Sequence, residues 1–150
     1  MKKYLSKILL ASVLAFTGFL ASPASQADAA SSNGVDYVSG SCKVELWTDY
    51  YTYYPSSSTT VDTYATNSGC GTLYYSMQVN DQWGHKISSQ VFTGSFSSQT
   101  PTKYFSVSMI QDYSYNGYDQ DAYTVQISLY SDSARTRYVG KATTNIMVVK

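Results

Sequence analysis

The chain has 150 residues, and its ten basic and ten acidic side chains give a formal net charge of zero. Scattered lysines in a near-neutral chain argue against binding to nucleic acid or to anionic lipid, because both require clustered basic residues. Sixteen Tyr and many Ser, Thr and Val residues, with Glu45 as the single Glu, favour pleated sheet over helix. The Tyr, Val and Ile side chains also supply apolar area that disordered chains lack.

Residues 1–29 are predicted to be a secretory signal peptide. A basic start (residues 1–7) precedes an apolar run (8–20), and Ala27-Asp28-Ala29 offers small residues to signal peptidase. The run is shorter than the roughly 20 residues that a membrane-spanning helix needs. We therefore expect cleavage after Ala29, with an uncleaved anchor as the alternative. A secreted, extracellular protein without integral membrane association follows, and the lysine-rich start is consistent with a bacterial source.

The remaining chain is predicted to form one domain. Residues 30–40 are rich in Ser and Gly and indicate a flexible N-terminal arm, followed by a β domain at 41–150. Cys42 and Cys70 are the two cysteines, and in an exported chain they most simply form one disulfide. Closing the loop between Cys42 and Cys70 would add roughly 3–4 kcal/mol to the free energy of unfolding in the chain-entropy account. The alternatives for these cysteines are a zinc site and a catalytic thiol. A zinc site needs more ligands than the two cysteines and the single His85 supply, and a catalytic thiol needs a nearby base.

Alternating apolar and polar residues predict a series of short strands. Alternation is clearest at 72–80 and 122–130, and weaker patterns occur at 42–49, 59–66, 87–91 and 103–110. Residues 137–149 fit one long bent strand or two short strands with a break near Gly140. Turn residues separate these runs, including Gly94 to Pro101 and 112–121. Seven to eight strands predict an antiparallel, immunoglobulin-like β-sandwich, with a small β-barrel as the alternative.

Aromatic residues concentrate in the segment Trp47–Pro55. In an extended chain Tyr51 and Tyr53 would share one face and Tyr50 and Tyr54 the other. Because a sheet has one core face, at least two of these rings are expected to contact solvent or a partner. The alternative is structural, because cross-strand aromatic pairs also stabilise exposed faces. The predicted aromatic contact surface consists of Trp47, Tyr50, Tyr51, Tyr53, Tyr54, Trp83, Tyr113, Tyr115 and Tyr118.

An acidic segment partly matches a calcium loop. Asp112, Ser114, Asn116 and Gly117 occupy positions one, three, five and six of that pattern, and Asp119 adds another oxygen ligand. The twelfth position is Tyr123 instead of a bidentate Glu. Calcium is therefore the one cofactor to consider, and the alternative is that these residues simply favour turns.

Catalytic motifs are not apparent. The Gly-x-Ser-x-Gly, Ser-x-x-Lys and His-Glu-x-x-His patterns do not occur. A pair of acid/base carboxylates leaves no sequence signature, so Glu45 and the Asp residues stay open as candidates. The sequence favours a secreted, non-catalytic binding protein whose aromatic loops contact a polysaccharide, the cell wall or a protein surface. A small secreted toxin or bacteriocin, and a secreted enzyme or enzyme inhibitor, are the alternatives.

Overall fold

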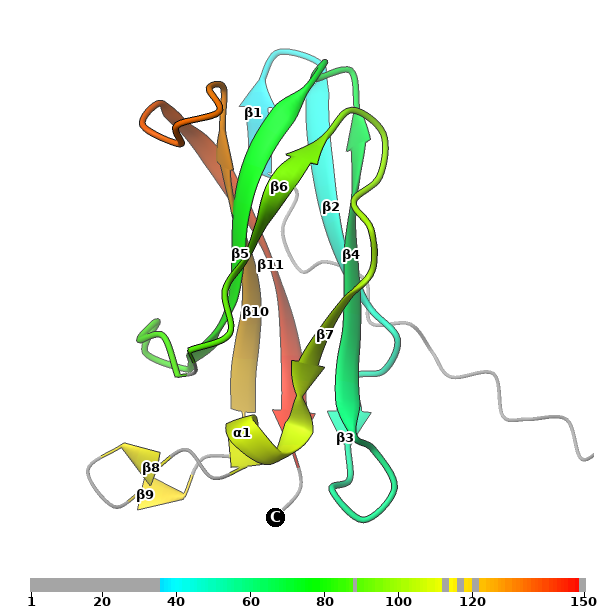
Figure 1. Ribbon diagram of the computed structural model, residues 1–150, viewed down its shortest axis with the longest axis vertical. Helices are drawn as coiled ribbons and strands as arrows, with labels where there is room; N and C mark the ends of the chain where they lie inside the picture. The colour runs from blue at the N-terminus through cyan, green and yellow to red at the C-terminus, as the bar shows by residue number, and fades with distance from the viewer. Residues whose placement is uncertain (1–35, 88, 112–113, 116–117, 120–121, 149–150) are drawn as a thin grey trace, which may run out of the picture.

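The computed structural model describes residues 36–87, 89–111, 114–115, 118–119 and 122–148, so the predicted signal peptide lies outside it. Two β-sheets pack face to face (Figure 1). The first sheet has the order β1 (Asp36–Ser39), β2 (Cys42–Thr48), β4 (Thr60–Ser68) and β7 (Lys103–Ser106). The second has the order β3 (Thr52–Tyr53), β11 (Tyr138–Val148), β10 (Ala122–Tyr130), β5 (Leu73–Asp81) and β6 (Phe92–Phe96). All strand pairs in them are antiparallel except β3 with β11.

The core lies between the two sheets. Buried and partly exposed residues alternate along β2, β4, β5 and β10, so each strand turns one row of side chains inward. Val44, Leu46, Met77, Ile127 and Ile146 are fully buried members of this core. Burial of each such side chain stabilises the fold by about 1.5–3 kcal/mol. The predicted antiparallel sandwich is confirmed.

The predicted disulfide is also confirmed. The Sγ atoms of Cys42 and Cys70 are 2.04 Å apart. Cys42 begins β2 and Cys70 follows the end of β4, so the bond joins neighbouring strands of the first sheet, where Lys43 pairs with Ser68.

The predicted strand at 103–110 is half wrong. The strand β7 ends at Ser106, and the helical turn α1 (Val107–Gln111) follows. Val107 and Ile110 are both buried, which their spacing of one helical turn permits, whereas Met109 is exposed. The Ser106 Oγ accepts a hydrogen bond from the Met109 N–H at 3.4 Å, as an N-cap residue does. An apolar residue at every second position therefore did not indicate a strand here.

The predicted strand at 87–91 and the predicted turn from Gly94 are corrected as well. Ile87 is buried and its N–H donates to the Val79 carbonyl, but the strand that follows β5 and pairs with its outer edge is β6, at Phe92–Phe96. A Cβ atom on Gly94 would lie 2.9 Å from the Tyr75 hydroxyl. Gly94 is thus required by the packing of a buried ring inside a strand, not by a turn.

Two further boundaries differ from expectation. Residues 36–39, inside the expected flexible arm of 30–40, form β1 and pair with β2. Residues 138–148 form one strand whose register with β10 shifts between Leu129 and Tyr130, next to Gly140. The bulge settles the choice in favour of one long bent strand.

The strand directions bring three connections to one end of the sandwich. The chain leaves β2, β5 and β7 at this end, where β3, α1, β8 (Ser114–Tyr115) and β9 (Tyr118–Asp119) also lie (Figure 1). We call it the loop end. The disulfide and the β10–β11 turn lie at the opposite end. No helix in the described part of the chain is long and apolar enough to span a membrane.

Candidate functional site

The segment 49–53 crosses from one sheet to the other at the loop end. The N–H of Asp49 donates to the Asp62 carbonyl at 3.0 Å and so keeps Asp49 with the first sheet. Two residues later the Tyr51 carbonyl accepts from the Met147 N–H at 2.8 Å, and β3 continues as the edge strand beside β11. We call residues 49–53 the crossing segment.

Tyr53 anchors the crossing segment in the core. Its side chain is fully buried, and its hydroxyl donates to Asp49 Oδ1 at 2.7 Å and accepts the Tyr50 N–H at 3.2 Å. The Asp62 N–H donates to the same Asp49 oxygen at 3.1 Å. Burial, and next the hydrogen bond to Asp49, raise the pKa of Tyr53 well above its usual range, so the hydroxyl stays protonated as a donor.

Three of the four neighbouring tyrosines face solvent. Tyr50 is 46%, Tyr51 48% and Tyr54 53% exposed. The prediction that at least two rings leave the core is met, but the expected pairing of faces is wrong, because Tyr51 is exposed and Tyr53 is buried. The reason is that β3 has only two residues, so simple alternation does not extend to Tyr51. Tyr53 therefore does not belong to a contact surface.

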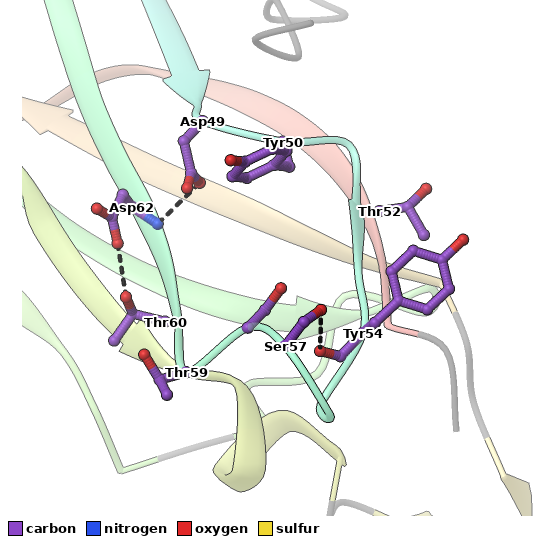
Figure 2. A pocket seen from close by; sticks show the side chains of 9 residues that line it. Asp49, Tyr50, Thr52, Tyr54, Ser57, Thr59, Thr60 and Asp62 are labelled. Atoms are coloured by element: carbon purple, nitrogen blue, oxygen red, sulfur yellow. Dashed lines mark hydrogen bonds between the residues drawn. The ribbon is translucent and has the colours of Figure 1, made fainter. Parts of the chain in front are cut away.

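Two of these exposed rings, those of Tyr50 and Tyr54, line an open pocket. Its volume is about 450 Å³. Figure 2 shows the carboxyl groups of Asp49 and Asp62 on one side and the Tyr54 ring on the other. The lining consists of two carboxylates, two tyrosine rings and five hydroxyl side chains, from Asp49, Tyr50, Thr52, Tyr54, Ser57, Ser58, Thr59, Thr60 and Asp62. We call this cavity the tyrosine pocket.

Backbone hydrogen bonds hold residues 54–59, which form one wall of the tyrosine pocket. The Tyr54 carbonyl accepts the N–H groups of Ser57 and Ser58 at 2.8 and 2.7 Å, which folds residues 54–58 into a tight turn. The Thr59 carbonyl accepts the Val107 N–H at 3.0 Å and so ties this wall to α1. The pocket is therefore bounded by segments with defined hydrogen-bond partners.

Aromatic residues on the outer face of the first sheet adjoin the pocket. Trp47 pairs directly with Tyr64, and their rings stack with centroids 6.4 Å apart. Tyr104, which is 55% exposed, lies directly opposite Asp62. Trp47 therefore lies on a strand instead of a loop, its Nε1 is buried, and a contact role for it stays a prediction. Sequence reasoning missed Tyr64 and Tyr104, although each alternates with core residues of a predicted strand and is therefore placed on the outer face.

The turn after β5 is also at the loop end. Trp83 in this turn is 53% exposed. Gln82 and Tyr51 line a second, smaller pocket of about 230 Å³ together with Ala122 to Thr124, Asn145 and Ile146. The turn after β5 and the crossing segment thus line the same small pocket, and a contact role for Trp83 stays a prediction.

Asp81 organises that turn. Its buried carboxylate accepts the N–H groups of Trp83 and His85 at 2.9 and 2.8 Å, and His85 Nδ1 lies 3.0 Å from its other oxygen. Burial by itself would raise the pKa of Asp81, but these hydrogen bonds outweigh it and hold that pKa below its usual range. The Asp81 carboxylate is thus part of the architecture that presents Trp83.

The lowered pKa predicts a loss of stability in acid. A carboxyl whose pKa is lower in the folded than in the unfolded state stabilises the fold above the unfolded value of about 4, and this contribution disappears as the pH falls through the folded value. We expect Asp81→Asn to be less stable than the parent at pH 7, and the difference to shrink below about pH 4. Urea unfolding of both proteins between pH 7 and pH 2.5 measures this. An equal difference across the whole range would contradict it.

The predicted calcium ligands are not assembled into a site by the described residues. Asp112 and Asn116, like Tyr113, lie outside them. Ser114 and Asp119 pair in the β8–β9 ladder, as do Tyr115 and Tyr118. Among the described residues, no three acidic, His or Cys side chains are placed so that they could hold a metal ion together. Calcium binding by this segment, and a contact role for Tyr115 and Tyr118, stay predictions.

The fold and the tyrosine pocket together define a class of protein, namely a small immunoglobulin-like β-sandwich with a candidate binding site at one end. The chain belongs to the YqgA MG2 macroglobulin domain family, whose model matches residues 27–150. It is 48% identical over 87 residues to the cell wall-binding protein YqgA of Bacillus subtilis strain 168. That alignment covers 55% of this chain and 59% of the relative. No solved structure matches the chain.

Proposed function

We propose that the protein is secreted and binds the cell wall without catalysis, through the tyrosine pocket and the aromatic residues that adjoin it. The observation that carries this proposal is that the exposed rings of Tyr50 and Tyr54 line one open pocket with five hydroxyl side chains. The name of the Bacillus subtilis relative, a cell wall-binding protein, supports the choice of target.

The chemistry of the pocket suits a glycan. A sugar ring has an apolar face that packs on an aromatic ring, while its hydroxyl groups need hydrogen-bond partners around its edge. Tyrosine rings offer the flat apolar surface, and the Thr, Ser and Asp side chains offer the partners. The volume of about 450 Å³ lies within the usual range of roughly 300–1,000 Å³ for small-ligand sites. The glycan strand of the wall is therefore the ligand that we favour.

The double variant Tyr50→Ala with Tyr54→Ala tests this proposal. Each ring contributes about 0.5–1.5 kcal/mol beyond its buried area, so binding to purified, insoluble peptidoglycan is expected to weaken by about tenfold or more. The measurement is a depletion isotherm on the mature protein. Tyr53 is expected to keep its position in both proteins, because its hydroxyl stays bonded to Asp49 although its edge-to-face contact with the Tyr50 ring is lost.

Tyr138→Ala is the matched control. Tyr138 is 58% exposed but lies at the start of β11, at the opposite end of the sandwich. Its removal should leave the isotherm unchanged. If Tyr138→Ala lowers the affinity for peptidoglycan as much as the double variant does, binding depends on exposed aromatic residues in general and not on the pocket. Failure of the parent protein to bind the wall would overturn the proposal.

A further inference from the structure

The tyrosine pocket has an unbalanced charge. Asp49 and Asp62 both contribute carboxylates, and none of the nine residues that line the pocket is Lys, Arg or His. A ligand with phosphate or carboxylate groups would meet like charge there. A cationic ligand would meet opposite charge.

The hydrogen-bonding capacity of the pocket is also unbalanced. The Thr60 hydroxyl donates its proton to Asp62 Oδ1 at 2.7 Å, and the Ser57 hydroxyl donates to the Tyr54 carbonyl at 3.3 Å (Figure 2). A hydroxyl has one proton and two lone pairs, so these two oxygens can offer only lone pairs to a ligand. Together with the carboxylates they favour a ligand that donates hydrogen bonds.

The aromatic wall adds a third property. The Tyr54 ring lies across the pocket from the two carboxyl groups, and the Tyr50 ring lies next to Asp49 (Figure 2). The faces of aromatic rings attract cations within about 6 Å. A cation between these walls would interact with the rings and with the carboxylates at the same time.

We infer that the tyrosine pocket binds a primary ammonium group carried by the wall polymer, with Asp62 as its main counter-charge. An ammonium group has three N–H donors, no acceptor and a positive charge, which matches all three properties. Asp62 is assigned this role because Asp49 already accepts two hydrogen bonds at one oxygen, from Tyr53 and from the Asp62 N–H. The inference rests on the proposed function and specifies the chemical group that is bound.

Two sources of ammonium exist in such a polymer, namely an amino sugar that is not N-acetylated and a free amine on a peptide stem. N-acetylation removes the charge, leaves one of the three N–H donors and adds a carbonyl acceptor. The acetylated and free forms of one sugar oligomer therefore differ at the group that the pocket is inferred to recognise.

Calorimetric titration of the mature protein distinguishes these cases. The probes are glucosamine oligomers, N-acetylglucosamine oligomers of the same length, and Nα-acetyl-lysine amide as an amine without sugar. We expect the free oligomer to bind at least tenfold more tightly than the acetylated one, and added salt to reduce the difference. Comparable binding of the lysine amide would support the ammonium site and assign the peptide stem as the source.

The variant Asp62→Asn removes the charge with little change in shape. It is expected to abolish the preference for the free amine, because the affinity for the free oligomer should fall by more than the affinity for the acetylated one. Glu45→Gln is the matched control, because it removes one negative charge from β2 outside the pocket, where Glu45 pairs with Lys43 at 2.7 Å. Thermal unfolding of both variants checks that the fold is retained.

The outcomes separate the inference from the proposed function. If the parent binds both oligomers equally and Asp62→Asn changes neither affinity, the ammonium site is overturned while binding to the wall glycan stands. If the parent binds neither the oligomers, the lysine amide nor peptidoglycan, both proposals fail. A preference that Glu45→Gln abolishes as well would assign the effect to net charge and overturn the role of Asp62.

Discussion

Replacing both cysteines, Cys42→Ala with Cys70→Ala, is expected to lower the free energy of unfolding by about 3 kcal/mol and the Tm by roughly 10 °C. The bond closes a loop with a sequence separation of 28 residues, so its loss releases conformational entropy in the unfolded chain. Urea and thermal unfolding under non-reducing conditions measure the change. The parent protein should behave like the variant once its disulfide is reduced.

Wall binding at low temperature should survive this change. Cys42 begins β2 and Asp49 follows its end, so the disulfide and the tyrosine pocket lie at opposite ends of the sandwich. A stability loss below about 1 kcal/mol would show that the β2–β4 ladder holds this end without the disulfide. Loss of binding by a variant that is still folded would contradict the separation of the two ends.

The second large effect is expected for Tyr53→Phe. The substitution keeps the buried ring but removes the hydroxyl that donates to Asp49 and accepts from the Tyr50 N–H. Hydrogen bonds to charged groups contribute about 1.5–3 kcal/mol, so the free energy of unfolding should fall by about 2 kcal/mol. Because the same hydroxyl positions Asp49 and Tyr50 in the pocket, affinity for peptidoglycan should fall about fivefold or more.

Tyr75→Phe provides the comparison for Tyr53. Tyr75 is equally buried, but its ring packs edge-to-face on Phe96, in β5 and β6 and away from the pocket. It should leave peptidoglycan affinity unchanged whatever its effect on stability. A Tyr53→Phe protein that is less stable but binds normally would limit Tyr53 to a structural role.

Most of the fold could be predicted because one face of most strands is buried. Alternation located β5 and β10 within a residue, and the even number of cysteines predicted the disulfide. The errors occur where local patterns have two physical explanations. Val107 continues the alternation of Phe105 toward Met109 but also fits a helical turn with Ile110, and Gly94 is explained by the Tyr75 ring instead of a turn. In both cases the choice between the two explanations depends on which distant residues of the same chain pack against these positions.

The candidate site could be predicted only in part. The tyrosines of the segment Trp47–Pro55 were found from composition, but which rings leave the core depends on β3 being only two residues long. Asp62 could not be assigned, because it meets Asp49 through a contact between residues 13 apart in sequence. The pocket forms only when the strands pair, and its negative charge comes from Asp49 and Asp62, which belong to no recognisable sequence motif.

The crossing segment has a mechanical consequence. The two sheets of a β-sandwich are held together by interdigitating side chains and not by hydrogen bonds between their strands. Here a stretch of five residues is hydrogen-bonded to the first sheet through Asp49 and to the second through Tyr51. Sliding would have to break both attachments and displace the buried Tyr53 ring. Movement of one sheet over the other would therefore change the shape of the pocket only after this segment has been displaced.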